Sequence, residues 1–296
     1  MEPLRLDKVS IDPLPWKNQI EISMLRLDKI HSDISGNKWF KLKFYFEEAN
    51  SRNTQTIATF GGAWSNHILA TAAACQLQRL KSAGIIRGEK PKVFSYTLNK
   101  ALDYGMKLIF VSRDEYMQKI VPEDYADILQ GAYIINEGGY GQPGAAGAAT
   151  IADYYKNENY THICCAAGTG TMMAGLIKAS KAQQEIVGVS VLKNNSGMQN
   201  ETEALLTHED KKKKFTFIHD YHFGGYAKYT AELIDFMNDF YRQAAIATDF
   251  VYTAKLIYGI YDLIEKNFFP PNSRLLIIHS GGLQGNHSLK SGMLIF

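Results

Sequence analysis

A lysine within a short polar run has the setting of a nucleophile. The run is Ser35-Gly36-Asn37-Lys38, and aromatic and apolar residues follow it. Among such neighbours a lysine amine loses its proton more readily than in water, and a neutral amine attacks aldehydes. Pyridoxal phosphate is the aldehyde most used in this way. The pattern predicts a catalytic Lys38, which requires a phosphate site, a carboxylate site and a partner for the pyridine ring.

A glycine-rich turn predicts the phosphate site. An apolar strand pattern ends in Ala167-Gly168-Thr169-Gly170-Thr171, and a helical pattern follows. The free N–H groups of a helix start bind anions, and threonine hydroxyls add donors. The alternative is a tight turn that binds nothing. The turn does not match a nucleotide P-loop. It matches the dinucleotide fingerprint only in part, because Met173 replaces the third glycine and the next strand ends without an acidic residue.

A second turn of this kind predicts the carboxylate site. The sequence Gly61-Gly62-Ala63-Trp64-Ser65-Asn66-His67 lies where another strand ends and a helix begins. Polar side chains and backbone N–H groups at such a tip form an anion nest, so Ser65, Asn66 and His67 are candidates for binding a substrate carboxylate. The alternative is that Ser65 or Asn66 only caps the helix and His67 is a surface donor.

Two tyrosines and a serine complete the candidate site. Tyr226 follows Gly224-Gly225 and Tyr252 lies in a second distinctive segment, although 17 tyrosines in the chain make a structural role the ordinary expectation. Ser280 follows the apolar run Leu275–His279, at the end of a strand that faces the ligand crevice of an open α/β sheet. Its hydroxyl could bond a pyridine nitrogen. No His, Cys or carboxylate pattern typical of a metal site accompanies these residues.

Short apolar runs alternate with helical patterns along the chain. This order predicts an α/β fold with parallel strands and helices on both faces. The expected strands are Ile20–Leu27, Thr56–Phe60, Lys107–Val111, Ala132–Asn136, Thr161–Ala166, Ile186–Leu192 and Leu275–His279; the expected helices include Lys38–Asn50, Ser65–Leu80 and Met172–Ser180. The glycine cluster at Gly138–Gly147 could be a hinge between two domains or a turn beside a ligand.

The composition excludes several classes of partner. Apolar residues make up 46% of the chain and its net charge is +2, which gives no reason to expect nucleic acid or an anionic membrane. No apolar run reaches the ~18 residues of a membrane span, and no secretory signal is expected. Three cysteines without a C-x-x-C pair predict buried thiols in a cytoplasmic protein. The charge run Lys211–Lys214 predicts a solvated loop.

Taken together, the motifs resemble the 1-aminocyclopropane-1-carboxylate deaminase / D-cysteine desulfhydrase family. These proteins are a branch of the tryptophan-synthase-β-like, fold type II pyridoxal-phosphate enzymes. The resemblance spans nearly the whole chain and rests on the motifs quoted above together with Glu137-Gly138-Gly139, Gly225-Tyr226, Asp249…Val251-Tyr252-Thr253…Lys255 and His279-Ser280-Gly281-Gly282. It implies two open, twisted, mostly parallel sheets flanked by helices in a three-layer αβα arrangement. Residues 1–44 and 149–296 would form a large cofactor domain, and residues 45–148 a small inserted domain.

The resemblance also implies roles for single residues. Lys38 would hold pyridoxal phosphate covalently, Asn66 would contact its phenolic oxygen, and Gly168, Thr169, Gly170 and Thr171 would hold its phosphate. Ser280 would face the pyridine nitrogen, and Ser65, Tyr226 and Tyr252 would serve catalysis around a small amino-acid substrate. A cytoplasmic homodimer is what the family suggests.

Three departures from the family pattern bear on the reaction. Ser35 and Phe40 replace a glycine and an arginine of the lysine motif, and Ala227-Lys228-Tyr229 replaces Gly-x-Pro after Tyr226. Thr253 stands where ring-opening members carry glutamate near the pyridine nitrogen, which resembles the D-cysteine desulfhydrase pattern. A deaminase or lyase that forms a 2-oxo acid and ammonia is therefore expected. The alternatives are a nicotinamide-dependent oxidoreductase and a protein that holds the cofactor without turnover.

Overall fold

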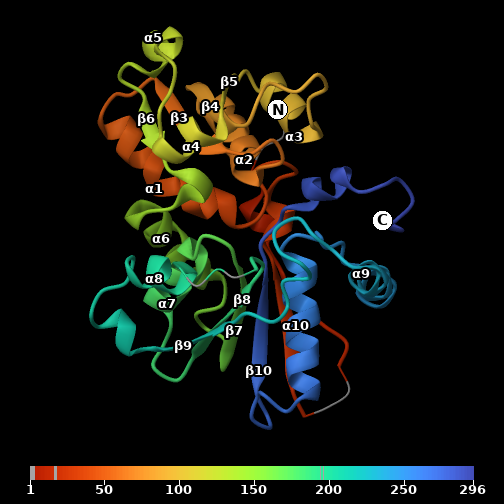
Figure 1. Cartoon of the computed structure of the whole chain (residues 1–296). Coiled ribbons are helices and arrows are strands. Elements are labelled where there is room, and N and C mark those ends of the chain that lie inside the picture. Colours follow the sequence, from red (N-terminus) through yellow and green to blue (C-terminus); the bar gives the residue numbers. More distant parts are fainter. Residues whose placement is uncertain (1–3, 17–18, 194, 196) are drawn as a thin grey trace.

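Two mostly parallel sheets form the framework of the protein. The structure is a computed structural model that describes residues 4–16, 19–193, 195 and 197–296 (Figure 1). The six-stranded sheet has the order β1-β2-β10-β7-β8-β9, with β1 (Ile11–Pro13), β2 (Glu21–Arg26), β7 (His162–Ala167), β8 (Glu185–Ser190), β9 (Lys214–Ile218) and β10 (Arg274–His279). The four-stranded sheet has the order β5-β4-β3-β6, with β3 (Thr56–Gly61), β4 (Lys81–Arg87), β5 (Lys107–Val111) and β6 (Tyr133–Ile135). Within the described residues, only the β1–β2 pair is antiparallel.

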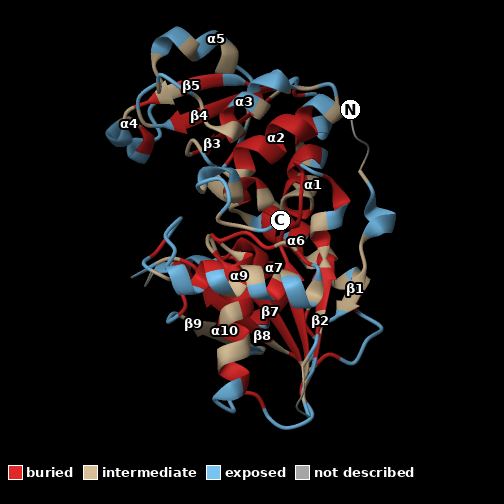
Figure 2. Cartoon of the chain, turned by 90° about the vertical axis from the view of Figure 1, so that its right-hand side faces the viewer, coloured by how far each residue is buried: buried red, intermediate tan, exposed pale blue. Residues whose placement is uncertain are grey.

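Helices cover both sheets and leave the central strands buried. They are α1 (Asn37–Ser51), α2 (Asn66–Leu77), α3 (Tyr96–Asp103), α4 (Arg113–Gln118), α5 (Ala126–Leu129), α6 (Gln142–Ala149), α7 (Thr171–Ala179), α8 (Gly197–Glu203), α9 (Ala231–Ala244) and α10 (Thr253–Glu265). Figure 2 shows the strands and α2 largely buried, whereas α4, α5 and α9 carry exposed residues on their outer sides. The predicted α/β fold of flanked parallel sheets is confirmed.

Alternate residues of the central strands serve opposite sides of the large sheet. In β7, Ile163 and Cys165 pack with residues of α6 and α7, whereas Cys164 and Ala166 pack with residues of α9 and α10. This alternation follows from the two-residue period of a strand, and apolar residues on both faces are typical of a covered parallel sheet. All three cysteines are buried free thiols, as predicted.

The predicted elements are present with shifted ends, and three strands were missed. Strand β1 is short, and β4 contains Gly84, which interrupts its apolar run. The run Lys211–Lys214, predicted to be a solvated loop, is exposed at all positions except Lys213, but its first two residues end a short 3-10 helix and its last residue begins β9. The amine of Lys213 instead donates to the carbonyl oxygens of Ile177 and Lys178 at the end of α7.

The chain crosses between the two sheets through α1 and α6. Figure 1 shows the four-stranded sheet with α2–α5 in the upper half and the six-stranded sheet with α7–α10 below. Helix α1 continues across the predicted boundary at residue 44, and α6 ends near the one at 148; the two-domain division stays a prediction. The calls on Met1–Pro3 and Asn194 fall outside the described residues. In the part of the chain that the structure describes, no helix is long and apolar enough to cross a membrane.

Candidate active site

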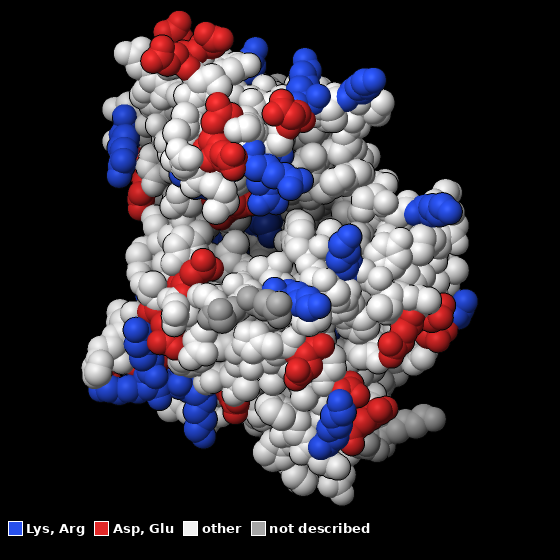
Figure 3. Space-filling model, in the orientation of Figure 1, with Lys and Arg blue, Asp and Glu red and all other residues white. Residues whose placement is uncertain are grey.

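A cavity of about 820 Å³ opens where the carboxyl ends of the two sheets meet. Figure 3 shows the surface hollowed between the two halves, with basic side chains inside the hollow. Of the residues predicted from sequence, all but Thr171 line it: Lys38, Ser65, Asn66, His67, Gly168, Thr169, Gly170, Tyr226, Tyr252 and Ser280. Segments that are distant in the sequence are thus brought to one site, while their individual roles stay predictions.

Lys38 lies in the first turn of α1, and a glycine places it there. Gly36 precedes the helix with a φ of 67°, and a Cβ at this position would lie 1.8 Å from the carbonyl oxygen of Ser280. The close approach therefore requires glycine and fixes the helix start against the turn after β10. The Lys38 amine donates to Oδ1 of Asn37 at 2.8 Å. Burial lowers the pKa of Lys38 to about 8, opposed in part by the negative charge of Asp249.

A second buried lysine, Lys41, lies one turn further along α1. Its amine donates to the carbonyl oxygen of Gly138 at 3.1 Å and to Oγ1 of Thr169 at 3.5 Å. Burial, and then the charge of Lys38, hold the pKa of Lys41 well below its usual value. Sequence reasoning assigned Lys41 no role. Its i,i+3 spacing from Lys38 was the available signal, because residues at this spacing share one face of a helix.

The turn between β7 and α7 leaves the start of its helix open. Gly170 is the N-cap with a φ of 71°, and no side chain caps the helix. A Cβ on Gly170 would lie 2.1 Å from Oγ1 of Thr202, so only glycine fits. Thr171 is fully buried and its hydroxyl lies 3.0 Å from that of Thr169, which orients Thr169 at the cavity wall. Uncapped N–H groups beside the Lys41 amine form a site for an anion.

The turn between β3 and α2 offers side chains instead. The hydroxyl of Ser65 caps α2 by accepting from the N–H of Ile68 at 3.4 Å. Oδ1 of Asn66 is buried and lacks a hydrogen-bond partner among the described residues. A Cβ on Gly282 would lie 2.8 Å from Nδ2 of Asn66, so the lack of a side chain at Gly282 leaves the space that the Asn66 amide occupies. The capping role considered from the sequence is thus present at Ser65, and the ligand role of the segment stays a prediction.

His67 is a neutral acceptor rather than a donor toward the cavity. Its Nε2 lies 2.9 Å from Oγ1 of Thr59, and that hydroxyl donates its hydrogen to the carbonyl oxygen of Ile135. Nε2 therefore carries the ring hydrogen, and Nδ1 is left buried without a partner among the described residues. Burial and the charges of Lys38 and Lys41 hold the pKa of His67 well below its usual value. Such an Nδ1 does not donate to a carboxylate, which argues against the role predicted for His67, while the carboxylate role of Ser65 and Asn66 stays a prediction.

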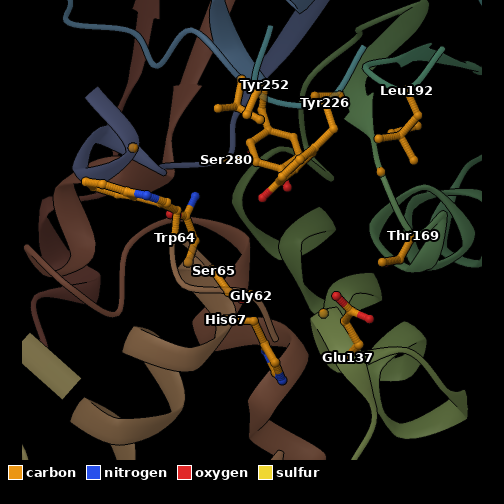
Figure 4. A pocket seen from close by; sticks show the side chains of 18 of the residues that line it. Gly62, Trp64, Ser65, His67, Glu137, Thr169, Leu192, Tyr226, Tyr252 and Ser280 are labelled. Atoms are coloured by element: carbon orange, nitrogen blue, oxygen red, sulfur yellow. The ribbon is translucent and has the colours of Figure 1, made fainter. Parts of the chain in front are cut away.

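Two tyrosine hydroxyls enter the cavity together. Figure 4 shows Tyr226 and Tyr252 with their hydroxyl groups directed into the open space, and their ring centroids are 6.2 Å apart. The Lys38 amine lies 6.0 Å from the centroid of the Tyr252 ring. Burial raises the pKa of both phenols, which keeps both protonated as donors. The amine of Lys255 donates to the carbonyl oxygens of His222 and Gly225, and so holds the segment that presents Tyr226.

Two residues near the end of the large sheet carry hydroxyl groups, and only one of the two lines the cavity. Ser280 follows β10 and lines the cavity. Thr253 does not line the cavity. It is buried at the start of α10, and its hydroxyl donates to Oδ1 of Asp249 at 2.7 Å. Asp249 in turn accepts from the N–H groups of Val251, Tyr252 and Thr253. The structure thus places a buried carboxylate behind the threonine that the sequence singled out.

Sequence reasoning missed three further charged residues at the cavity: Arg87, Glu137 and the exposed Glu201 of α8. Arg87 ends β4, a strand that was not predicted, and Glu137 lies in the glycine cluster after β6. The cluster was interpreted as a hinge or a ligand-side turn, and the second interpretation fits: a Cβ on Gly138 would lie 2.8 Å from Cγ2 of Thr169. No three His, Cys, Asp or Glu side chains of the described chain converge as a metal site would require.

Comparisons with known proteins agree with this geometry. A family model described as "pyridoxal-phosphate dependent enzyme" matches residues 17–281. The chain is 28% identical, over 90% of its own length and 86% of the relative's, to a Pyrococcus abyssi protein provisionally named a 1-aminocyclopropane-1-carboxylate deaminase. It is 26% identical to the mitochondrial bifunctional D-cysteine desulfhydrase/1-aminocyclopropane-1-carboxylate deaminase of Arabidopsis thaliana, over 96% of this chain and 77% of that protein. The structure of an ACC deaminase homologue superposes with a TM-score of 0.81 at 25% identity, covering 94% of this chain and 90% of that one.

Proposed function

The chain belongs to the family of pyridoxal-phosphate dependent enzymes, and we propose that it removes the β substituent of a small amino acid to give a 2-oxo acid and ammonia. One observation supports this most strongly. The Lys38 amine and the uncapped start of α7 open into the same cavity, as a covalently held cofactor with a phosphate tail requires. The family assignment argues against the alternative that the protein is a nicotinamide-dependent oxidoreductase.

The residues that are present fit the cofactor. The N–H groups at the start of α7 and the buried amine of Lys41 suit its phosphate, and the Ser280 hydroxyl suits its pyridine nitrogen. The unpartnered amide oxygen and adjacent NH₂ of Asn66 are free for its ring substituents or for the substrate. When bound, pyridoxal phosphate supplies an aldehyde carbon for the amine and an electron sink for the α carbon of the substrate.

The Lys38 amine is suited to hold and move a proton. With a pKa of about 8, a substantial share of this amine is neutral near physiological pH, so Nζ can accept the α proton of the substrate and return it later. Burial disfavours protonation of the Lys38 amine. Asp249 acts in the opposite direction, and the balance keeps the pKa of Lys38 in the working range.

Side chains from both sheets would orient the substrate. Ser65 and Asn66 would bind its carboxylate from the start of α2. The protonated hydroxyls of Tyr226 and Tyr252 would donate toward the leaving group, on the side of the cavity where Figure 4 shows them. Groups held in place this way lower the barrier through orientation rather than through new chemistry.

Elimination is favoured over cyclopropane opening by the residue at position 253. A threonine whose hydroxyl is committed to Asp249 gives the ring nitrogen no direct acidic partner. Without such a partner the ring nitrogen would draw electrons from the substrate's α carbon less strongly, which would still suffice for the loss of a good β leaving group such as a thiolate. The Arabidopsis relative is named for both reactions, so the branch itself leaves either open.

Release of ammonia from a panel of D- and L-amino acids tests the proposal. The panel contains cysteine, β-chloroalanine, serine and 1-aminocyclopropane-1-carboxylate. We expect turnover of a β-substituted alanine of one chirality, little turnover of the cyclopropane, and none by Lys38→Ala. Turnover of the cyclopropane alone, or of nothing in the panel, would contradict the proposed reaction.

We further propose a homodimer in a reducing, cytoplasmic environment. The free buried thiols of all three cysteines support the environment, and the family resemblance supports the dimer. Light scattering of the purified protein would give the mass in solution; a monomer would contradict the dimer.

A further inference from the structure

Two oppositely charged side chains, Arg87 and Glu137, line the cavity in addition to the proposed catalytic residues, and the exposed Glu201 of α8 lies at its wall as well. Arg87 ends β4, and Glu137 begins the turn after β6. Figure 4 shows the Glu137 carboxylate directed into the open space. The Arg87 guanidinium lies beside the carboxylate-binding turn, because a Cβ on Gly62 would be 3.8 Å from its Nη2. Both charges also act on the phenol of Tyr226, which is proposed to face the leaving group: burial raises the pKa of Tyr226 most, the charge of Glu137 raises it further and that of Arg87 lowers it.

Neither charge has an ionic partner in the described chain. Within 4.0 Å, Arg87 meets no carboxylate and Glu137 meets no basic group. Both act on one buried phenol, Tyr116. The guanidinium lies 5.5 Å from its ring centroid, and after burial the charge of Glu137 raises its pKa while that of Arg87 lowers it. The two charges are thus neighbours that do not neutralise each other.

The chemistry of this pair selects its ligand. A neutral group would leave both charges unmatched, and an anion alone would be attracted by Arg87 but repelled by Glu137. A group with both signs pairs with both residues through charge-assisted hydrogen bonds. The cavity of about 820 Å³ lies in the upper range for ligand sites and has to accommodate substrate as well as cofactor.

We infer that Arg87 and Glu137 bind the far end of the substrate. The preferred substrate is then a cysteine thioether whose sulfur carries a second amino-acid group, with its own carboxylate and ammonium. Arg87 pairs with the distal carboxylate and Glu137 with the distal ammonium. The inference rests on the proposed function and names the substrate class of that site.

The reaction balances with water as the only co-reactant. The α proton goes to Lys38, the C–S bond breaks with its electron pair on sulfur, and the thiolate takes up a proton. Hydrolysis of the remaining three-carbon unit gives pyruvate and ammonia. A thioether of two amino acids plus water therefore yields an amino-acid thiol, pyruvate and ammonia, with no external oxidant or reductant.

Four cysteine thioethers distinguish the possibilities on the holoenzyme. They are S-methylcysteine (neutral end), S-carboxymethylcysteine (anionic), S-(2-aminoethyl)cysteine (cationic) and cystathionine (zwitterionic), each in both α configurations. We expect kcat/KM to be about ten- to a hundredfold higher for cystathionine than for S-methylcysteine, as the loss of charged hydrogen bonds implies.

Three variants identify the residues responsible. Arg87→Gln should lower kcat/KM for the zwitterionic and anionic thioethers, and Glu137→Gln for the zwitterionic and cationic ones, with the neutral thioether unaffected by either. Lys119→Gln is the matched control. Its amine also lies over the Tyr116 ring, at 4.8 Å from the centroid, but Lys119 is not among the residues lining the cavity. This variant should keep the wild-type order of substrates.

Calorimetric binding to cofactor-loaded Lys38→Ala gives a readout that needs no turnover. The inference is supported if cystathionine binds more tightly than S-methylcysteine and if Arg87→Gln or Glu137→Gln in the same background weakens that binding. This result supports the inference even if no thioether is cleaved. In that case only the proposed reaction fails. Equal binding of all four thioethers overturns the inference. A preference for the anionic or cationic thioether over the zwitterionic one overturns it as well.

Discussion

The two glycine-rich turns that line the cavity begin their helices in different ways. At the start of α2, the Ser65 hydroxyl accepts from a backbone N–H of the first turn, so the helix supplies its own cap. At the start of α7, the N-cap is Gly170 in the left-handed conformation and no side chain takes that place. Both turns follow a parallel strand, yet only the second leaves its N–H groups for an outside acceptor.

The difference assigns the two turns separate tasks. An uncapped helix start backed by the Lys41 amine suits the permanent phosphate of the cofactor. A capped start that also carries the Asn66 amide, whose oxygen has no partner among the described residues, suits a substrate that enters and leaves. Changes at the α7 turn should therefore lower cofactor affinity, whereas changes at the α2 turn should lower turnover and leave cofactor affinity intact.

The largest effect is expected from Gly170→Ala. The left-handed conformation costs a non-glycine residue about 1–2 kcal/mol. The contact with Thr202 adds overpacking of about 1–3 kcal/mol. We expect cofactor affinity to fall about a hundredfold in absorbance titrations of the apoenzyme. Gly62→Ala is the control on the other turn, because a Cβ there meets nothing closer than 3.8 Å; equal losses in both variants would remove the distinction between the turns.

Lys41→Met should separate stability from cofactor binding. Loss of a charged partner of the phosphate costs about 1.5–3 kcal/mol, or roughly ten- to a hundredfold in affinity. The apoenzyme, relieved of a buried amine that has no carboxylate partner among the described residues, should keep or raise its Tm. Lys43→Met on the same helix, whose amine lies over the Phe44 ring, is the control. Unchanged cofactor affinity in Lys41→Met would place the phosphate elsewhere.

The pH dependence of cofactor attachment should report the Lys38 amine. Only the neutral amine attacks an aldehyde, and its pKa of about 8 lies below the usual 10.5. The attachment rate to the apoenzyme should therefore rise with pH, roughly fifteenfold from pH 6.5 to 8, and level off above that. A rate that is flat from pH 6.5, or that still climbs steeply at pH 10, would show that the pKa of Lys38 is not set by burial in this way.

The smallest effect is expected from Ser65→Ala. Loss of the cap should cost about 1 kcal/mol of unfolding free energy. Loss of the proposed carboxylate contact should lower kcat/KM about tenfold. The affinity for the cofactor should not change. A drop in cofactor affinity as large as that of Gly170→Ala would mean that the two turns share one task.

Sequence reasoning found the framework because its signals are local. The Gly168–Thr171 turn and the Ser65 cap each lie directly between a strand pattern and a helix pattern, so neighbouring residues sufficed to locate them. The same locality explains the missed strand β4, whose apolar run is broken by Gly84.

The missed site residues depend on contacts between distant segments. Lys41 reaches Gly138 and Thr169, which lie 97 and 128 positions away in the chain. Arg87 and Glu137 become neighbours only because β4 and β6 flank β3 in one sheet. The tautomer of His67 follows from the hydroxyl of Thr59, which is itself fixed by the carbonyl of Ile135. No local pattern encodes these pairings.

The covalent attachment point is the most direct test of the account. The holoenzyme would be reduced with borohydride, which fixes the cofactor on the lysine that holds it, and its peptides would be mapped by mass spectrometry. We predict a modification at Lys38 alone, with Lys41 and Lys255 unmodified although both are buried amines of lowered pKa. Attachment at either of these, or no attachment at all, would contradict the account.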